Sequence, residues 1–150
     1  MLTLHPKKYV LLAEIKKIIT IYSSQINQKK LSINLNIENN LQVFEDINVL
    51  QTLIRNYVTN AIKFSYPKGV INFSIENETE NNLILQIEDN GIGLGNNSDN
   101  NETENQIRNS GRGSGIGLRI TEELAEKANI KISICSQQKK GTSVFITFTK

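Results

Sequence analysis

The sequence predicts an α/β domain, because segments with helical periodicity alternate with segments of strand pattern along its 150 residues. Apolar side chains recur at helical spacing in residues 6–27 and 46–64, which predicts two amphipathic helices. Apolar and polar side chains alternate in residues 31–37 and 70–76, which predicts half-buried strands. A chain of this length forms about one domain, so we expect a single unit over residues 1–150.

The N-terminal part of the chain predicts one helix and two short strands. The helix at 6–27 carries Pro6 in its first turn, where proline is well tolerated. Residues 31–37 follow as the first strand, Asn39–Asn40 form a turn, and residues 41–44 form a short second strand.

The middle of the chain predicts a capped helix and a pair of strands. Asp46 suits the N-cap of a helix that Pro67–Gly69 brings to an end. Residues 70–76 and 83–88 both alternate, and the polar residues 78–82 separate them. We therefore expect two adjacent antiparallel strands.

The last third of the chain predicts a long loop, a helix and two strands. Residues 95–112 are rich in asparagine and offer little apolar surface to bury, so we expect them to be mobile. Long loops in compact domains often act as lids over active sites, and a disordered insertion is the alternative. A helix at 114–127 and strands at 130–135 and 143–148 follow.

The composition excludes several classes of protein. Hydrophobic residues make up 38% and charged residues 21%, as is usual for soluble globular domains. A net charge of +2 is too small to favour nucleic acid or an anionic membrane, and no apolar stretch is long enough to span a bilayer. The one cysteine, Cys135, excludes an internal disulfide, which suits a reducing compartment. We therefore expect a cytoplasmic domain that neither enters a membrane nor binds nucleic acid.

Two glycine-rich clusters, at 89–93 and 111–118, carry the chemical information. Glycine allows positive φ and lets the backbone approach a ligand closely. Asp89 ends a predicted strand, and a buried carboxylate there can accept a hydrogen bond from an exocyclic amine such as that of adenine. The alternative is a turn carboxylate that caps its own backbone.

The second cluster directly precedes the predicted helix at 114–127. The first N–H groups of a helix lack partners within it and form a ready anion site. Alternating glycines would let phosphates approach that backbone, namely Gly111, Gly113, Gly115 and Gly117. A flexible hinge is the alternative, and the spacing matches neither a P-loop nor a dinucleotide fingerprint.

One face of the predicted helix at 46–64 carries Asn56, Asn60 and Lys63. Asparagine oxygen suits Mg²⁺, which usually keeps water and phosphate ligands beside one or two protein oxygens. Lysine supplies a point charge for phosphate. A solvated polar helix face is the alternative for each residue alone, but together with the glycine clusters they predict a nucleotide site.

These segments, in this order, resemble the ATP-binding catalytic domain of sensor histidine kinases. That family shares the Bergerat ATP-binding fold with DNA gyrase, heat-shock chaperone ATPases and mismatch-repair ATPases. Residues 49–64 resemble its asparagine box, 89–93 and 113–118 its two glycine boxes, and Gly141–Thr142 its short last box. The resemblance implies a two-layer α/β (α+β) sandwich, with a mixed sheet of about five strands, helices on one face, and residues 95–112 as a flexible ATP lid.

The resemblance implies roles for residues of the asparagine box. Asn60 would supply the side-chain oxygen to Mg²⁺ that bridges the phosphates, and Asn56 and Lys63 would contact phosphate. Phe64 would pack against the base or its pocket. Catalysis would come from positioning and from charge neutralisation by Mg²⁺ and Lys63.

The resemblance also implies roles for the remaining boxes. Asp89 would accept a hydrogen bond from the adenine amino group, and Thr142 would help to hold a bridging water. Gly91 and Gly93 would let the chain pass the base. The second glycine box would present backbone N–H groups to the phosphates, at Gly113, Gly115, Gly117 and Leu118.

The residue one helical turn before Asn60 separates the subfamilies. Gyrase-type ATPases and anti-sigma serine kinases carry a glutamate there as general base, whereas Asn56 cannot take a proton. A histidine acceptor needs no such base, because neutral imidazole already presents a lone pair. In the phosphoacceptor motif an acidic residue follows the histidine and a proline comes later, whereas the one histidine here, His5, is followed directly by Pro6 and Lys7. We therefore expect ATP to phosphorylate a histidine on a dimerisation and phosphoacceptor domain outside this chain, and through it a response regulator.

Three alternatives stay open at this point. Residues 95–112 contain no phenylalanine, unlike the corresponding family segment, which favours a nucleotide-binding regulatory module without catalysis. An anti-sigma-type serine kinase and a plain interaction domain are the others. In the kinase interpretation, the chain is the cytosolic part of a larger sensor kinase and does not phosphorylate itself alone.

Overall fold

The computed structural model describes residues 3–92, 114–137 and 139–150, with the side chains of 114–118 and 137 excepted. The predicted lid at 95–112 therefore lies outside the described residues. The elements in chain order are β1 (Pro6–Val10), α1 (Leu11–Ile21), α2 (Ser23–Lys29), β2 (Ser32–Asn36), β3 (Gln42–Asp46), α3 (Ile47–Phe64), β4 (Val70–Glu78), β5 (Asn82–Asp89), α5 (Ser114–Lys127), β6 (Lys131–Gln137) and β7 (Gly141–Thr149).

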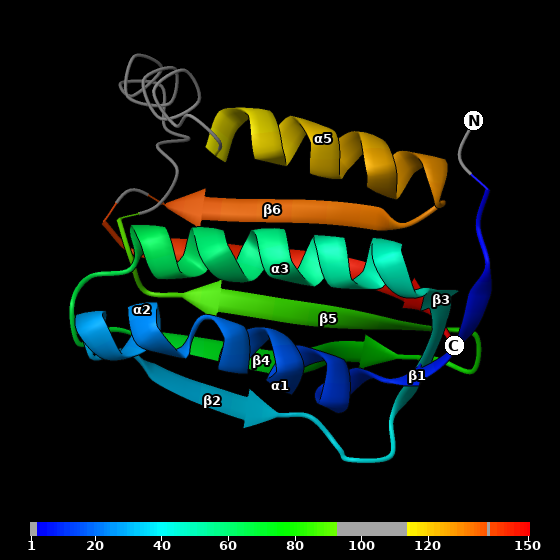
Figure 1. Ribbon diagram of the computed structural model, residues 1–150, viewed down its shortest axis with the longest axis horizontal. Helices are drawn as coiled ribbons and strands as arrows, with labels where there is room; N and C mark the ends of the chain where they lie inside the picture. Colours follow the sequence, from blue (N-terminus) through cyan, green and yellow to red (C-terminus); the bar gives the residue numbers. More distant parts are fainter. Residues whose placement is uncertain (1–2, 93–113, 138) are drawn as a thin grey trace.

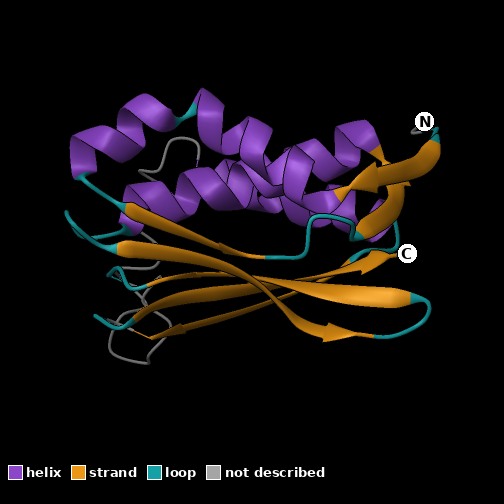
Figure 2. Ribbon diagram, turned by 90° about the horizontal axis from the view of Figure 1, so that it is seen from below, coloured by secondary structure: helices purple, strands orange, loops and turns teal. Residues whose placement is uncertain are grey.

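Five strands form one mixed sheet in the order β2-β4-β5-β7-β6. Strand β2 pairs parallel with β4, and every other neighbouring pair is antiparallel. The helices lie in a single layer on one face of this sheet (Figure 2). The predicted α/β sandwich with a mixed five-stranded sheet is confirmed, and so is the antiparallel pairing of β4 with β5.

Strand alternation decides which side chains of β5 enter the core. Leu83, Leu85, Ile87 and Asp89 are all buried against the helix layer, whereas the residues between them are half-buried or exposed on the open face. Because side chains on a strand point to opposite faces in turn, Asp89 continues an apolar row into the interior. The strand pattern thus delivers a carboxylate to the inner face of the sheet.

The prediction of a helix from Pro6 is wrong. Residues Pro6–Val10 form β1, which pairs antiparallel with β3 in a separate two-stranded sheet at the right of Figure 1. A strand needs a partner for its backbone N–H and C=O groups, and that partner is distant in sequence, so local periodicity does not reveal it. The helix begins at Leu11 instead, and Tyr22 divides it into α1 and α2.

The N-cap prediction for α3 is confirmed. Asp46 Oδ1 accepts hydrogen bonds from the backbone nitrogens of Asn48 (2.8 Å) and Val49 (3.2 Å), which otherwise lack partners at the helix start. Helix α3 then runs over the centre of the sheet, and its apolar face is buried from Val49 to Phe64.

The elements that carry the predicted site residues end or begin at one end of the molecule. The last turn of α3, the ends of β5 and β6 and the start of α5 all lie at the left of Figure 1. Strand β7 begins there too, because a hairpin joins it to β6. This topology brings three separate sequence motifs together.

Candidate functional site

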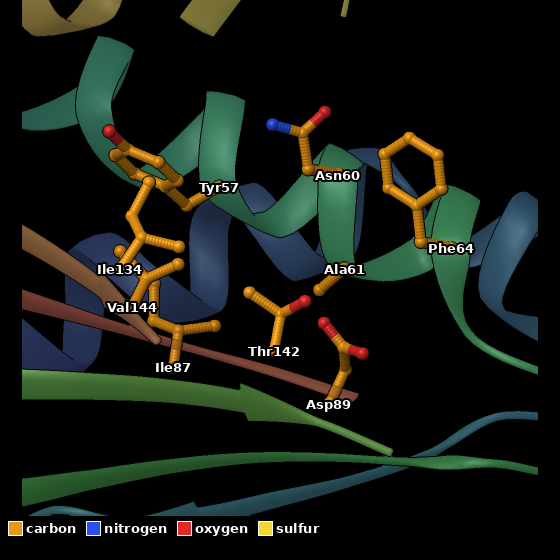
Figure 3. Close-up of a pocket in the computed structure, with 9 residues that line it drawn as sticks. All are labelled: Tyr57, Asn60, Ala61, Phe64, Ile87, Asp89, Ile134, Thr142 and Val144. Atoms are coloured by element: carbon orange, nitrogen blue, oxygen red, sulfur yellow. The ribbon is translucent and has the colours of Figure 1, made fainter. Parts of the chain in front are cut away.

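A pocket lies between α3 and the sheet at this end of the molecule (Figure 3). The space between these elements amounts to about 320 Å³, open mouth included. Its lining comprises Tyr57, Asn60, Ala61, Phe64, Ile87, Asp89, Ile134, Thr142 and Val144. Asp89 and Asn60, predicted from separate motifs, thus both belong to the lining of one pocket.

A polar row of directly paired residues begins in the pocket floor, which Asp89 and Thr142 line, and ends beside it at Ser136. Asp89 of β5 lies opposite Thr142 of β7, which in turn lies opposite Ser136 of β6. The hydroxyls of Ser136 and Thr142 are 2.9 Å apart and share a hydrogen bond, and all three residues are buried. Three strands therefore place a carboxylate and two hydroxyls side by side.

An apolar row continues the floor two residues further along the same strands. It consists of Ile87, Val144 and Ile134, which are again directly paired. The roof is one face of α3 at helical spacing, formed by Tyr57, Asn60, Ala61 and Phe64. A flat apolar slot that ends in a buried carboxylate suits an aromatic ring with a hydrogen-bond donor on its edge.

The Asp89 carboxylate is the chemically distinctive group of the pocket. The residue is only 7% exposed, and Oδ1 accepts a hydrogen bond from the backbone nitrogen of Gly91 at 2.9 Å. Burial raises the pKa of this carboxyl above its ordinary value, while backbone hydrogen bonds from Gly91 and Thr142 oppose that shift. Asp89 therefore caps its own turn, as the simpler alternative held, and also faces the pocket.

Two glycines let backbone segments pass close together beside Asp89. A Cβ at Gly91 would lie 2.0 Å from the carbonyl oxygen of Phe64, to which Ile92 donates at 2.9 Å. Gly141 has φ +116° and a Cβ there would lie 2.0 Å from the Asp89 carbonyl oxygen. Only glycine fits at either position, so both residues shape the pocket by the absence of a side chain.

The asparagine-box residues divide between the pocket and its surroundings. Asn60 and Phe64 line the pocket, and in Figure 3 both side chains point away from the sheet. Lys63 is exposed, with Nζ 5.4 Å from the centre of the Phe64 ring. Asn56 lies outside the lining, and its Nδ2 donates to Thr121 Oγ1 on α5. Whether Asn56 and Lys63 contact phosphate stays a prediction.

The second glycine box is described only from Ser114 onward. Helix α5 begins at that residue, as predicted, so Gly115 and Gly117 are among the first four residues, whose N–H groups have no partner within a helix. Leu118 is the fifth residue of the helix. Gly93 and Gly113, like the predicted lid, lie outside the described residues.

Sequence reasoning missed the walls of the pocket and one hydroxyl beside its floor. The missed residues are Tyr57, Ala61, Ile87, Ile134, Ser136 and Val144. Strand alternation from Asp89 and Thr142, and helical spacing from Asn60, would have identified most of them. The pairing of β5 with β7, which is needed to place the residues of both strands in one pocket, could not be predicted from any local pattern.

Tyr57 presents a buried hydroxyl without a hydrogen-bond partner among the described residues. The residue is 1% exposed, and burial raises the pKa of its phenol. Because an unpaired buried hydroxyl costs about 1–3 kcal/mol, we expect Tyr57→Phe to raise the free energy of unfolding by about 1 kcal/mol. Urea unfolding of the nucleotide-free protein measures this. A loss of more than about 1 kcal/mol would mean that the hydroxyl is bonded.

A family model agrees with this geometry. Residues 45–150 match the family described as "Histidine kinase-, DNA gyrase B-, and HSP90-like ATPase". This match covers α3, the five-stranded sheet except β2, and α5. It therefore includes every residue of the pocket lining.

Named relatives and solved structures are also similar. An uncharacterized sensor-like histidine kinase, ycf26 of Porphyra purpurea, is 28% identical over 95% of this chain. Histidine protein kinase SaeS of Staphylococcus aureus is 29% identical over 86% of it. The alignments span 24% and 39% of those two proteins.

Of the helices in the described ranges, none has both the length and the apolar character that crossing a membrane requires.

The solved catalytic domain of histidine kinase ThkA shares the fold. It superposes with a TM-score of 0.77 over 97% of this chain and 96% of that domain, at 17% identity. The same kinase has been solved in complex with response regulator protein TrrA, where the TM-score is 0.75, the identity 18%, and the coverage 98% of this chain and 42% of that one. At these identities the likeness concerns the fold alone.

Proposed function

This chain belongs to the histidine kinase-, DNA gyrase B- and HSP90-like ATPase family, and we propose that within it the chain is the ATP-binding catalytic domain of a sensor histidine kinase. The single observation that carries this proposal is the buried Asp89 carboxylate in the floor of the pocket, across from Asn60 on α3.

Adenine is the part of ATP that the pocket suits. Its ring would lie in the slot between Ala61 and the apolar row of the floor, where its faces are shielded from water. Its exocyclic amine would donate to the Asp89 carboxylate, and the neighbouring Thr142 hydroxyl would hold a bridging water. Guanine presents a carbonyl at that position, so it would leave the carboxylate facing another acceptor.

The phosphates would leave the slot toward the start of α5. Asn60 would supply one oxygen to Mg²⁺, which neutralises phosphate charge when bound, and Lys63 would add a positive charge at the same end of α3. Asn56 lies one turn earlier and would contact phosphate through water or after rotating from Thr121. Backbone N–H groups of Gly115 and Gly117, at the N-terminus of α5, suit an anion.

The acceptor we propose is a histidine outside this chain. No carboxylate stands at position 56 to take a proton from a hydroxyl, and neutral imidazole needs none. The γ-phosphoryl group would pass from ATP to an imidazole nitrogen on a helical dimerisation and phosphoacceptor domain, and ADP would leave. The phosphohistidine would then pass its phosphoryl group to a response regulator, the class of partner found with ThkA.

Nucleotide titration tests this function. The chain should bind ATP, bind GTP at least about tenfold more weakly, and bind ATP more tightly with Mg²⁺ than without it. Mixed with the phosphoacceptor domain of its own kinase and labelled ATP, it should transfer label to histidine. Absence of any nucleotide-dependent change would refute the proposal, and binding without transfer would indicate a regulatory module instead.

Asn60→Ala is expected to abolish most of the Mg²⁺ dependence of ATP binding and to slow phosphotransfer by about a hundredfold. The reason is that the variant removes the one side-chain oxygen assigned to the metal. ATP affinity measured in EDTA should stay within about twofold of wild type, because the adenine contacts are intact.

Asn48→Ala is the matched control for this prediction. Asn48 is an exposed asparagine at the opposite end of α3, so its loss should change neither quantity. If Asn60→Ala keeps the full effect of Mg²⁺ on ATP affinity, the metal is held elsewhere.

A further inference from the structure

Lys29, the last residue of α2, reaches the C-terminal end of α3. Its ammonium donates to three backbone carbonyl oxygens there, those of Ile62 (2.8 Å), Lys63 (2.8 Å) and Ser65 (2.9 Å). The two helix ends lie together at the left of Figure 1. All three donor positions of the ammonium are thus used on one helix terminus.

The remaining carbonyls at this helix end have other partners. The Ala61 oxygen accepts from the nitrogen and the hydroxyl of Ser65, and the Phe64 oxygen accepts from Ile92. The backbone of α2 is also bonded to the loop that follows α3, since the backbone nitrogen of Lys68 donates to the Lys29 carbonyl oxygen at 2.7 Å. Lys29 therefore completes a terminus that would otherwise leave acceptors unpaired.

The helix end that Lys29 caps is the one that carries the proposed phosphate contacts. Asn60, Lys63 and Phe64 all belong to the last five residues of α3. The C-terminus of a helix carries the equivalent of about half a negative charge, which repels an approaching anion. Burial disfavours the charged form of Lys29 and lowers its pKa, so the three carbonyls are what stabilise its ammonium in place.

We propose that Lys29 is a positioning residue of the nucleotide site, which fixes the last turn of α3 and offsets its negative end so that a polyphosphate can bind beside Asn60 and Lys63. This inference rests on the proposed function. It differs from a purely structural cap in one respect: the contribution of Lys29 must grow with the charge of the ligand.

The test compares ligands that share adenine but differ in phosphate charge. Adenosine and Mg²⁺-ATP are titrated against wild type, Lys29→Met, Lys29→Gln and Lys29→Arg, at low salt. Lys29→Met and Lys29→Gln should weaken ATP binding by about tenfold and adenosine binding by less than about twofold. Lys29→Arg should restore ATP affinity to within about threefold of wild type, because it keeps the charge and donors.

Lys30→Met is the matched control. Lys30 is the next residue, is exposed, and its replacement removes the same charge from almost the same place. It should leave both affinities within about twofold of wild type, because an exposed charge is screened by solvent.

The outcomes separate this inference from the proposed function. Wild type that binds neither ligand would refute the function itself. Equal losses of adenosine and ATP affinity, or no loss of either, would overturn the role of Lys29 while leaving the function standing. If Lys29→Met does not fold, the ATP affinities of Lys29→Gln and Lys29→Arg decide whether the charge of Lys29 matters. Glutamine can donate hydrogen bonds without a charge, whereas arginine donates them and keeps the charge.

Discussion

Asp89→Asn should bind ATP at least about tenfold more weakly than wild type. The carboxylate already accepts a hydrogen bond from the backbone nitrogen of Gly91, and the adenine amine would be a further donor. Asparagine offers one acceptor oxygen, and its amide group would face a donor on whichever side it is placed. A buried donor left without a partner costs about 1–3 kcal/mol. Isothermal titration with Mg²⁺-ATP measures the loss.

Glu88→Gln is the matched control for this variant. Glu88 is the preceding residue, exposed on the other side of β5, so the change removes the same charge without touching the pocket. We expect it to change ATP affinity by less than about twofold, because the charge is exposed. The variant Asp89→Asn should also lose part of the preference for ATP over GTP. Unchanged ATP affinity in Asp89→Asn would remove Asp89 from the adenine site.

Gly141→Ala should lower the free energy of unfolding by more than about 4 kcal/mol. The new Cβ would lie 2.0 Å from the Asp89 carbonyl oxygen and 2.9 Å from Asn90 Cα, both backbone atoms that cannot rotate away. The φ of +116° adds strain for any residue with a side chain. Strands β5 and β7 would have to separate where Asp89 and Thr142 pair, so nucleotide binding should be lost as well. Urea unfolding measures the first effect.

Ser74→Ala supplies the control on the open face of the same sheet. Ser74 sits in β4 with its side chain directed away from the helices, and its loss should cost less than about 0.5 kcal/mol. A loss of under about 1 kcal/mol for Gly141→Ala would show that the two strands tolerate a wider spacing than the structure has.

Elements specified by their own residues were predictable from the sequence. Helix α3 has an N-cap residue, an apolar stripe and a proline after its end, and the structure has it at Ile47–Phe64. The alternating segments became β4 and β5 for the same reason. Strand β1 was not predictable from its own residues, which suit the start of a helix equally well. Its strand conformation depends on pairing with β3.

The candidate site was predictable where one motif carried its own chemistry. The local sequence identified Asp89 as a carboxylate at a glycine turn and Asn60 as an amide on a helix face. In the structure both residues line one pocket. Ser136 did not, because its role comes from lying opposite Thr142 on the neighbouring strand. A serine in an alternating strand is ordinary until the strand order is known.

The contacts of Lys29 with the end of α3 could not be predicted from local sequence patterns. In the sequence Lys29 is one of two adjacent lysines just beyond the predicted helix at 6–27, where a positive charge suits that helix's own dipole. The structure directs it instead to the end of α3, more than thirty residues away. That contact depends on how α2 and α3 are packed, which no spacing within either helix encodes.

The most direct test of the central claim is to map ATP onto the chain by amide chemical shifts. In a titration of labelled protein with Mg²⁺-ATP, the largest changes should fall on Asn60, Asp89, Gly91 and Thr142. These residues come from α3, from the end of β5 and the turn after it, and from the start of β7, and these segments come together at the pocket between α3 and the sheet. Small changes there, with the largest ones on the open face of the sheet or around β1 and β3, would contradict the account.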